Sequence, residues 1–435
     1  MVYLINYIFI MVQRYLFLFL YANYSSKIMQ YSSFVLSNGL RIVHLSSESP
    51  VSYCGFAVHA GTRDEQSGQY GLAHFVEHTL FKGTEKRKVH HILNRMEVVG
   101  GELNAYTTKE ETFLYAICLQ EDIERAIELL SDLIYHSKFP ASEIEKEREV
   151  VIDEIHLYED TPSELIFDEF ENMVFAGTGL GHAILGDVDS IKQFTSESCR
   201  NFVKDFYCPE NMVFFSYGKT PFSKILKYIE KYSSANFSAT FNRSFQHRPE
   251  LLPAETVIQN KDLHQTHVVT GGKAYGISDG KRMGLLLLNN ILGGPGMNSR
   301  LNVNLREKYG LVYTVDSEVT SYTDTGVFTV YFGCVPESLE RCLHLVRKEL
   351  KRLRDSKLSG SQFTAALKQW KGQLGIANEH KENVALRLGK TFLHFNRYDS
   401  LQQTYQKIDA LTSEGLLEIA NEIFDEKQLF SLIYK

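Results

Sequence analysis

The chain lacks the patterns that mark several classes of protein. Its six cysteines are scattered without a C-x-x-C pair, so neither a disulfide framework nor a thiolate zinc site is predicted, and a reducing compartment fits best. It has no long run of basic residues, and 46 Lys and Arg against 53 Asp and Glu give a net charge of -7. Nucleic acids and anionic membranes are therefore not expected partners.

Proline is scarce, and no residue type dominates. With 9 Pro, 29 Gly, 44% hydrophobic and 23% charged residues, the composition excludes disordered, collagen-like and coiled-coil proteins. At about 150 residues per domain, a chain of 435 residues predicts two or three domains, each able to bury its own core.

The first 28 residues depart from this ordinary composition. Two apolar runs, MVYLINYIFIMV and YLFLFLYA, are broken by Gln13 and Arg14, and the segment has neither a basic start nor a small-x-small cleavage site. It could be a membrane anchor, a signal peptide, or translated upstream sequence with the true start at Met29. We favour the third, because a strand with an Asn-Gly turn is predicted at 34–45. A cytoplasmic protein is then expected, and a membrane-associated or exported one if residues 1–28 belong to it.

The chain contains an internal repeat. Residues 104–130 align with residues 320–346 at a constant offset of 216. The identities include Tyr106 with Tyr322, Thr107 with Thr323, Tyr115 with Tyr331, and Cys118 with Cys334. Both copies show an alternating strand, a turn and an amphipathic helix. We predict an α+β fold of two related α/β-sandwich units, each an antiparallel-rich sheet covered by helices.

A polar, serine-rich segment at 233–256 is the expected linker between the two units. It divides the chain into an apolar extension (1–28), a first unit (29–232) and a second unit (257–435).

The pentapeptide His74-Phe75-Val76-Glu77-His78 lies in a helix-compatible segment. Positions i and i+4 share one face of a helix, so the two imidazoles can converge on one ion with Glu77 beside them. This is the inverted form of a zinc-protease motif. The alternative is a half-exposed helix with two solvated histidines.

A catalytic zinc usually has three protein ligands and one open position. In the charged segment EIEKEREVVIDEIHLYEDTP, Glu147 and Glu154 lie seven residues apart and point the same way from a helix with an apolar seam. One could bind the metal while the other holds a ligand histidine. The alternative is a salt-bridged surface helix.

The segments GLAHFVEHTLFKGTEKR, GGELNAYTTKEETFLYA and EREVVIDEIHLYEDTP resemble the insulinase (pitrilysin-like) zinc metallopeptidases, and in length the mitochondrial-processing-peptidase type. The resemblance extends over about residues 34–435. It implies one Zn²⁺ per chain, bound by His74, His78 and Glu154, with Glu77 as general base and Glu147 as an auxiliary carboxylate.

The second unit has no counterpart of the metal motif. Aligning residues 71–81 with 284–294 places Leu287, Asn290 and Ile291 where the first unit has its two histidines and Glu77. The second unit is therefore predicted not to bind zinc there, which favours a functional rather than a structural role for the motif in the first unit.

The resemblance also assigns residues outside the metal motif. Arg306 and Tyr313 look like the family's pair that contacts substrate and stabilises the transition state, and Gly293, Gly294 and Gly296 resemble its substrate-contacting loop. For Arg306 and Tyr313 the alternative is a helix-end arginine and a core tyrosine.

The strand that begins at Asn104-Ala105-Tyr106-Thr107 matches the sheet edge onto which the family adds its substrate as an extra strand. The alternative is an ordinary edge strand protected by the charged residues Lys109, Glu110 and Glu111.

Longer relatives hold four such units, so this chain of two units is expected to form a dimer. A homodimer is the simplest form, with Arg306 and Tyr313 of one protomer facing the zinc of the other, and a heterodimer with a related subunit is possible. The expected activity is hydrolysis of peptides. The alternatives are a non-catalytic structural or regulatory subunit and a peptidase dedicated to one precursor.

Overall fold

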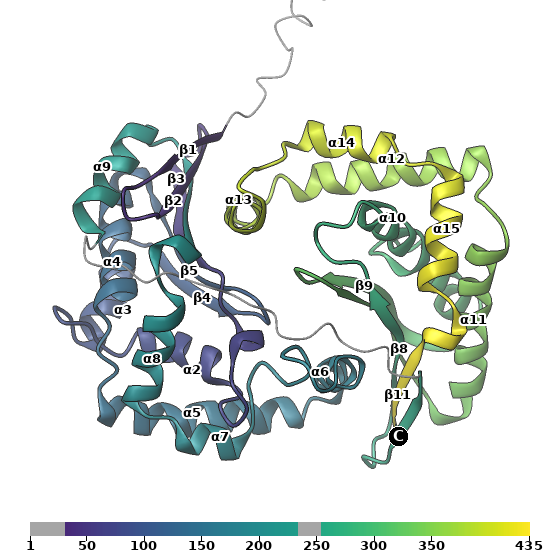
Figure 1. Cartoon of the computed structure of the whole chain (residues 1–435). Helices are drawn as coiled ribbons and strands as arrows, with labels where there is room; N and C mark the ends of the chain where they lie inside the picture. The colour runs from purple at the N-terminus through teal and green to yellow at the C-terminus, as the bar shows by residue number, and fades with distance from the viewer. Residues whose placement is uncertain (1–30, 234–253) are drawn as a thin grey trace, which may run out of the picture.

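The computed structural model describes residues 31–233 and 254–435, so the apolar extension and most of the predicted linker lie outside the described residues. Each half of the chain forms one sheet with helices around it, coloured purple to teal in the first half and mainly green to yellow in the second (Figure 1). The sheet of the first half has the strand order β1-β2-β6-β3-β5-β4. Its strands are β1 (Tyr31–Val35), β2 (Arg41–Ser46), β3 (Val51–Val58), β4 (Glu102–Thr107), β5 (Thr112–Leu119) and β6 (Met212–Gly218).

The sheet of the second half repeats this arrangement with the order β7-β11-β8-β10-β9. Its strands are β7 (Thr256–Gln259), β8 (Thr266–Ala274), β9 (Val312–Ser321), β10 (Gly326–Cys334) and β11 (Phe430–Tyr434). In each sheet one neighbouring pair is parallel, β2 with β6 and β7 with β11, and the other pairs are antiparallel. The predicted fold of two α/β units with antiparallel-rich sheets is confirmed.

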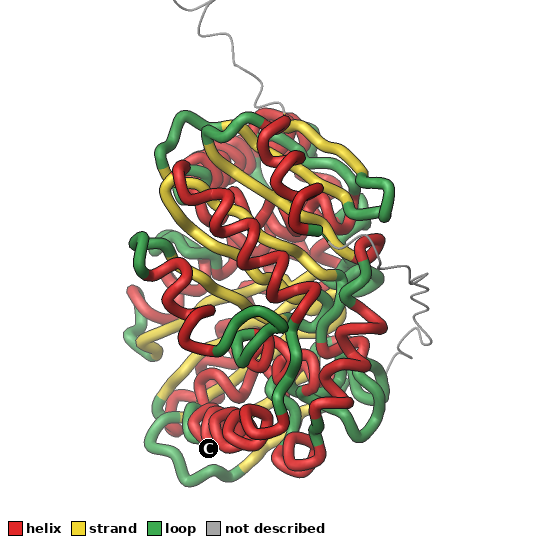
Figure 2. The backbone as a smooth tube through the Cα atoms, turned by 90° about the vertical axis from the view of Figure 1, so that its left-hand side faces the viewer, coloured by secondary structure: helices red, strands yellow, loops and turns green. Residues whose placement is uncertain are grey.

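Helices cross the faces of the strands in both halves (Figure 2). The first half contributes α2 (Leu72–Leu80), α3 (Val89–Glu97), α4 (Ile123–His136), α5 (Ala141–Glu159), α6 (Pro162–Val174), α7 (Val188–Gln193), α8 (Ser196–Phe206) and α9 (Phe222–Tyr232). The second half contributes α10 (Arg282–Gly293), α11 (Leu339–Asp355), α12 (Gly360–Ala377), α13 (Lys381–Phe395), α14 (Leu401–Asp409) and α15 (Ser413–Ile423). Within residues 31–233 and 254–435, no helix combines the length and apolar character that a membrane span needs.

The repeat found in the sequence is also a repeat of structure. Residues 104–130 form β4, β5 and the start of α4, and residues 320–346 form the end of β9, then β10 and the start of α11. The predicted strand at 34–45 is instead a hairpin, because the Asn-Gly turn separates β1 from β2 and pairs Phe34 with Ile42. Gly39 has a φ of 89°, a conformation that favours glycine.

Each half also covers the sheet of the other half. Helix α13 carries apolar residues at helical spacing, and Val384, Leu388 and Phe392 pack on the first sheet against Phe113 and Phe215. In return, Ile166, Phe170 and Val174 of α6 pack on the second sheet against residues of β8, β10 and β11. Figure 1 shows this exchange, with the yellow α13 beside β5 and the teal α6 beside the second sheet. The expectation that each unit buries its own core is therefore only partly right, since two of the four apolar clusters are shared.

Charged contacts also hold α13 against the first sheet. The Glu111 carboxylate, 3% exposed, accepts hydrogen bonds from His394 Nε2 at 2.6 Å and Lys390 Nζ at 3.2 Å. Burial alone would raise the pKa of Glu111, but the hydrogen bond from His394 and the charge of Lys390 hold that pKa well below its usual range.

We predict that Glu111→Gln lowers the free energy of unfolding by about 3 kcal/mol at pH 7, because it leaves buried partners unpaired. The pKa of Glu111 is lower in the folded state than in the unfolded state, where it is about 4.3. The contribution of Glu111 to the free energy of unfolding is therefore complete above about pH 4.3 and is lost as the pH falls toward the folded-state pKa. The denaturant midpoints of the two proteins should thus differ most at pH 7, and the difference should begin to shrink at about pH 3.5, which is below the unfolded-state pKa but above the folded-state pKa. The exposed Glu145→Gln is the control, and equal midpoints at pH 7 for Glu111→Gln would contradict the prediction.

Candidate zinc centre

Helix α2 presents the predicted metal motif at the edge of the first core. Its apolar residues Leu72, Phe75 and Val76 are buried in that core, which leaves the two histidines and Glu77 on the remaining face. The helix starts at Gly71 (φ 94°), which has no side chain to cap it. The sequence analysis missed the residue that does so: the buried carboxylate of Glu65 accepts the backbone N–H groups of Gly71 at 2.8 Å and Ala73 at 2.7 Å.

Helix α5 packs against α2 and brings in the two predicted carboxylates. The predicted apolar seam is confirmed for Ile144, Val151 and Ile155, all of which are buried. Glu147 is buried as well, and the side chain of Glu154 is 41% exposed. Glu147 therefore does not lie on a salt-bridged surface, whereas Glu154 is partly exposed.

His74, His78 and Glu154 converge, and one ligand atom from each lies within 4.8 Å of the others. Oε2 of Glu154 is 3.9 Å from Nε2 of His74 and 3.5 Å from Nε2 of His78. Two imidazole nitrogens and one carboxylate oxygen are a ligand set of catalytic zinc, so the residues fit the metal that the sequence predicts. No second group of this kind occurs in the described ranges, including the counterpart helix α10.

The surroundings shift the pKa values of the two histidines in opposite directions. Burial lowers the pKa of His74 to about 3, and the neighbouring His78 adds to the shift, so His74 is neutral and able to bind a metal at neutral pH. Burial also disfavours the charge on His78, but the hydrogen bond to Glu147 and the nearby carboxylates raise its pKa. The raised pKa means that a proton competes with a metal ion for this imidazole.

Glu147 holds His78 and does not belong to the ligand group. Its Oε1 lies 3.0 Å from Nδ1 of His78, and its Oε2 forms an ion pair with Lys82 Nζ at 2.6 Å. This contact places the proton on Nδ1 and leaves Nε2 free to bind a metal. Lys82 was not predicted; its only sequence signal is its position four residues after His78.

Glu77 lies beside the ligand group. Its Oε2 accepts a hydrogen bond from the Thr107 hydroxyl at 2.7 Å. Burial raises the pKa of Glu77 and the charge of Glu154 adds to this, which together outweigh the opposing effects of Thr107 and His78. The carboxylate is thus suited to taking up and returning a proton.

Thr107 ends β4, the strand predicted to receive substrate. Within the part of the chain that the structure describes, strand β4 is the edge of the first sheet and has β5 as its single partner, with Asn104 opposite Tyr115 and Ala105 opposite Leu114. Tyr106 stacks on Phe113 at 4.8 Å between ring centroids. The edge position is confirmed.

The alternative that charged residues protect this edge is wrong. Lys109, Glu110 and Glu111 are only 2%, 3% and 3% exposed and form ion pairs and hydrogen bonds inside the protein.

The predicted residues of the second half lie together. Arg306 belongs to a π-helical segment (Asn302–Glu307), and its guanidinium carbon lies 5.9 Å from the ring centroid of Tyr313. Tyr313 is 83% exposed, so the alternative of a core tyrosine is wrong. Gly293 ends α10, and Gly294 and Gly296 follow it in the connection to this segment. Among the described residues, neither Arg306 nor Tyr313 forms a hydrogen bond or ion pair with His74, His78 or Glu154.

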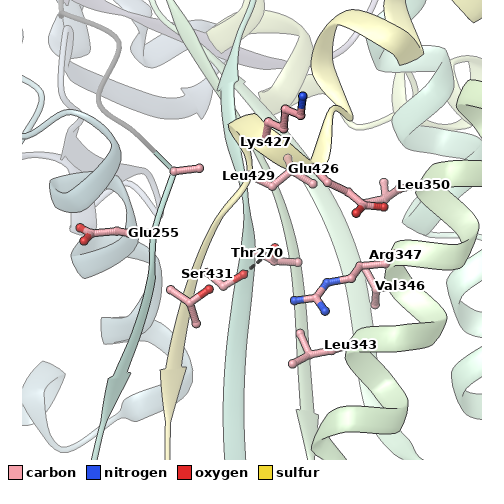
Figure 3. A pocket seen from close by; sticks show the side chains of 12 residues that line it. Glu255, Thr270, Leu343, Val346, Arg347, Leu350, Glu426, Lys427, Leu429 and Ser431 are labelled. Atoms are coloured by element: carbon pink, nitrogen blue, oxygen red, sulfur yellow. Dashed lines mark hydrogen bonds between the residues drawn. The ribbon is translucent and has the colours of Figure 1, made fainter.

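A cavity of about 280 Å³ lies elsewhere in the second half, between α11 and strands β7, β8 and β11 (Figure 3). Thr270, Arg347 and Ser431 are among its lining residues. None of the predicted site residues lines it, so this cavity is not part of the candidate centre.

Comparisons with known proteins agree with the site. Residues 41–188 match the insulinase (peptidase family M16) domain, and residues 193–370 match the peptidase M16 inactive domain. The uncharacterized zinc protease YmxG of Bacillus subtilis is 30% identical over 401 residues, which are 92% of this chain and 97% of that protein. An uncharacterized zinc protease of Rickettsia bellii is 31% identical over 399 residues, covering 92% of this chain and 96% of that protein.

Solved structures show the same fold. A protease from Helicobacter pylori superposes with a TM-score of 0.86 at 22% identity, covering 93% of this chain and 99% of that one. A peptidase M16 inactive domain from Pseudomonas fluorescens gives a TM-score of 0.87 at 19% identity, covering 93% and 97%. From the two domain matches, the identity to zinc proteases and the ligand group of α2 and α5, we conclude that the chain belongs to the insulinase family (M16) of zinc metallopeptidases.

Proposed function

We propose that the protein is a zinc-dependent endopeptidase that hydrolyses peptides or short unfolded polypeptides. The observation that carries this is the convergence of His74, His78 and Glu154 with Glu77 beside them. When bound there, Zn²⁺ supplies a Lewis acid that polarises a carbonyl and lowers the pKa of a water ligand to about 7.

The chain's own residues perform the proton transfers. Glu77 takes a proton from the attacking water and returns it to the leaving amine, and its raised pKa favours the first transfer, because a carboxylate with a higher pKa is a stronger base. Thr107 orients the Glu77 carboxylate through its hydrogen bond. Glu147 fixes the tautomer of His78 and thus supports metal binding.

The edge of β4 is the proposed substrate-binding strand. Among residues 31–233 and 254–435, β4 has one neighbouring strand, so the other edge of β4, formed by Asn104, Ala105, Tyr106 and Thr107, can pair with an extended peptide. Main-chain pairing of this kind tolerates many side chains, which supports a broad range of peptide substrates.

We assign the metal centre to residues 29–232 and a supporting role to residues 257–435, joined by the linker 233–256. Arg306 and Tyr313 are the proposed transition-state residues of the second unit, and they act across a dimer interface. The exposure of Tyr313, and of Met297 in the connection that follows α10, supports a surface that contacts another chain. A homodimer is the simplest assembly, and a heterodimer with a related subunit is the alternative.

Complementation tests the shared site. When His74→Ala and Tyr313→Phe chains are mixed equally, half of the dimers are mixed and one of their two sites is intact. Activity should then recover to about one quarter of wild type for a homodimer. Activity no higher than that of either variant alone would contradict a shared site.

Chelation tests the proposed function itself. Zinc removal is expected to abolish digestion of a peptide mixture, read by mass spectrometry, and added Zn²⁺ should restore it. Undiminished cleavage after chelation would contradict the proposal. A structural or regulatory subunit would cleave nothing when loaded with zinc, and a dedicated processing peptidase would cleave one precursor and few other peptides.

A further inference from the structure

The turn between β4 and β5 connects the candidate centre with three other parts of the molecule. Thr107 donates to Glu77, Lys109 Nζ donates to the carbonyl oxygen of His182, Glu110 contacts Thr323, and Glu111 contacts His394. We call residues 107–111 the hub turn. Two of its residues, Glu110 and Glu111, bind side chains of the second half of the chain.

The Glu110 carboxylate accepts three hydrogen bonds. Its Oε2 accepts the backbone N–H of Thr323 at 2.8 Å, and its Oε1 accepts the Thr323 hydroxyl at 2.7 Å and Nη1 of Arg63 at 2.5 Å. Arg63 also binds the second half of the chain, because it donates two hydrogen bonds of 2.7 Å to the carboxylate of Asp324. One buried carboxylate of the first half therefore fixes the position of residues 323–324.

The backbone of the hub turn is held rigidly by its neighbours, so a shift at one end of the turn is passed to the other end. The N–H of Thr108 donates to the carbonyl of Glu111 at 2.8 Å, and the N–H of Arg63 donates to the carbonyl of Lys109 at 2.8 Å. A Cβ on Gly61 would lie 2.3 Å from the carbonyl oxygen of Thr108, so the backbone packs without a gap. Only two residues separate Thr107 from Glu110, so displacement of Glu110 moves Thr107.

The repeat places two equivalent threonines at the two ends of this connection. Thr107 and Thr323 correspond at the offset of 216, and each donates its hydroxyl to a carboxylate of the first half. Thr107 holds Glu77. Thr323 holds Glu110, which belongs to the same turn as Thr107.

We propose that Glu110 is a positioning residue through which the second half sets the orientation of Glu77. Its bond to Thr323 locks the hub turn, and the hub turn holds the Thr107 hydroxyl against the Glu77 carboxylate. The catalytic meaning of this coupling rests on the proposed function, whereas the coupling itself is a property of the folded chain.

Hydrogen exchange of the metal-free protein tests the coupling without reference to activity. Glu110→Gln and the milder Thr323→Val should each speed amide exchange in peptides covering residues 102–112 by about tenfold. The matched control is Tyr322→Phe, which removes the adjacent bond from the Tyr322 hydroxyl to Glu171 (2.6 Å) and leaves the hub turn intact. Unchanged exchange in Thr323→Val, or an equal change in Tyr322→Phe, would overturn the proposal.

A kinetic double-mutant cycle tests the consequence. Thr107→Val and Glu110→Gln should each lower kcat by about fivefold to thirtyfold with little change in KM, and the double variant should be no slower than the slower single variant. Tyr322→Phe should not couple to Thr107→Val. If the fold-decreases in kcat of Thr107→Val and Glu110→Gln multiply in the double variant, the proposal is overturned. An inactive wild-type protein would contradict the proposed function. In that case the hydrogen-exchange comparison alone tests whether Glu110 and Thr107 are coupled.

Discussion

Glu77→Gln is expected to leave zinc bound and to lower kcat by about 10²–10⁴-fold, the usual contribution of a general acid–base group. The amide keeps the shape of the carboxylate and can still contact Thr107, but it cannot accept a proton from water. Glu77 is outside the ligand group of His74, His78 and Glu154, so zinc affinity should change little. The measurements are peptide turnover and zinc content of the purified variant.

The same chemical change at Glu154 is the matched control. Glu154→Gln removes the charge of a proposed ligand, so it should weaken zinc binding and reduce activity through metal loss. Excess Zn²⁺ should then restore activity in Glu154→Gln and not in Glu77→Gln. Full peptidase activity of Glu77→Gln would refute its role as general base.

Residues 29–233 produced alone are expected not to fold to a stable native state. Without α13, the faces of β2, β3, β5 and β6 that carry Phe113 and Phe215 would be exposed to water. Each fully buried apolar side chain contributes about 1.5–3 kcal/mol, and the segment around α13 buries Val384, Leu388, Phe392 and Leu393 from the helix and Tyr398 just after it on the first sheet. Their loss is comparable to the whole stability of a domain, about 5–15 kcal/mol.

Near-ultraviolet circular dichroism and the chemical-shift dispersion of NMR spectra would measure whether residues 29–233 alone form native tertiary structure. Residues 254–435 supplied as a separate chain should restore native spectra, because α13 and α6 then complete each other's sheets. A cooperative unfolding transition of residues 29–233 alone would contradict the shared cores. The two units are thus repeats in sequence but depend on each other for folding.

The metal motif could be predicted because its information is local or strictly spaced. The i, i+4 histidines follow from helix geometry, and a spacing of 76 residues, taken from the family resemblance, located Glu154. The same holds for the repeat, since paired strands and the following helix keep their spacing in both copies.

Contacts between distant segments could not be read from the sequence. The cap of α2 by Glu65, the bond between Thr107 and Glu77, and the exchange of α6 and α13 depend on tertiary packing. Lys109, Glu110 and Glu111 illustrate the difficulty, because a charged cluster beside an edge strand usually faces water and here is buried in ion pairs.

X-ray absorption at the zinc edge, on the zinc-loaded protein and on Glu154→Gln, tests the central claim most directly. A shared site of two histidines and one carboxylate predicts two nitrogens at about 2.0–2.1 Å and a carboxylate oxygen at about 2.0–2.2 Å, without sulfur. The oxygen shell should change in Glu154→Gln while the two nitrogens remain. A sulfur shell, or a wild-type spectrum identical to that of Glu154→Gln, would contradict the assignment of residues 74, 78 and 154 to one ion.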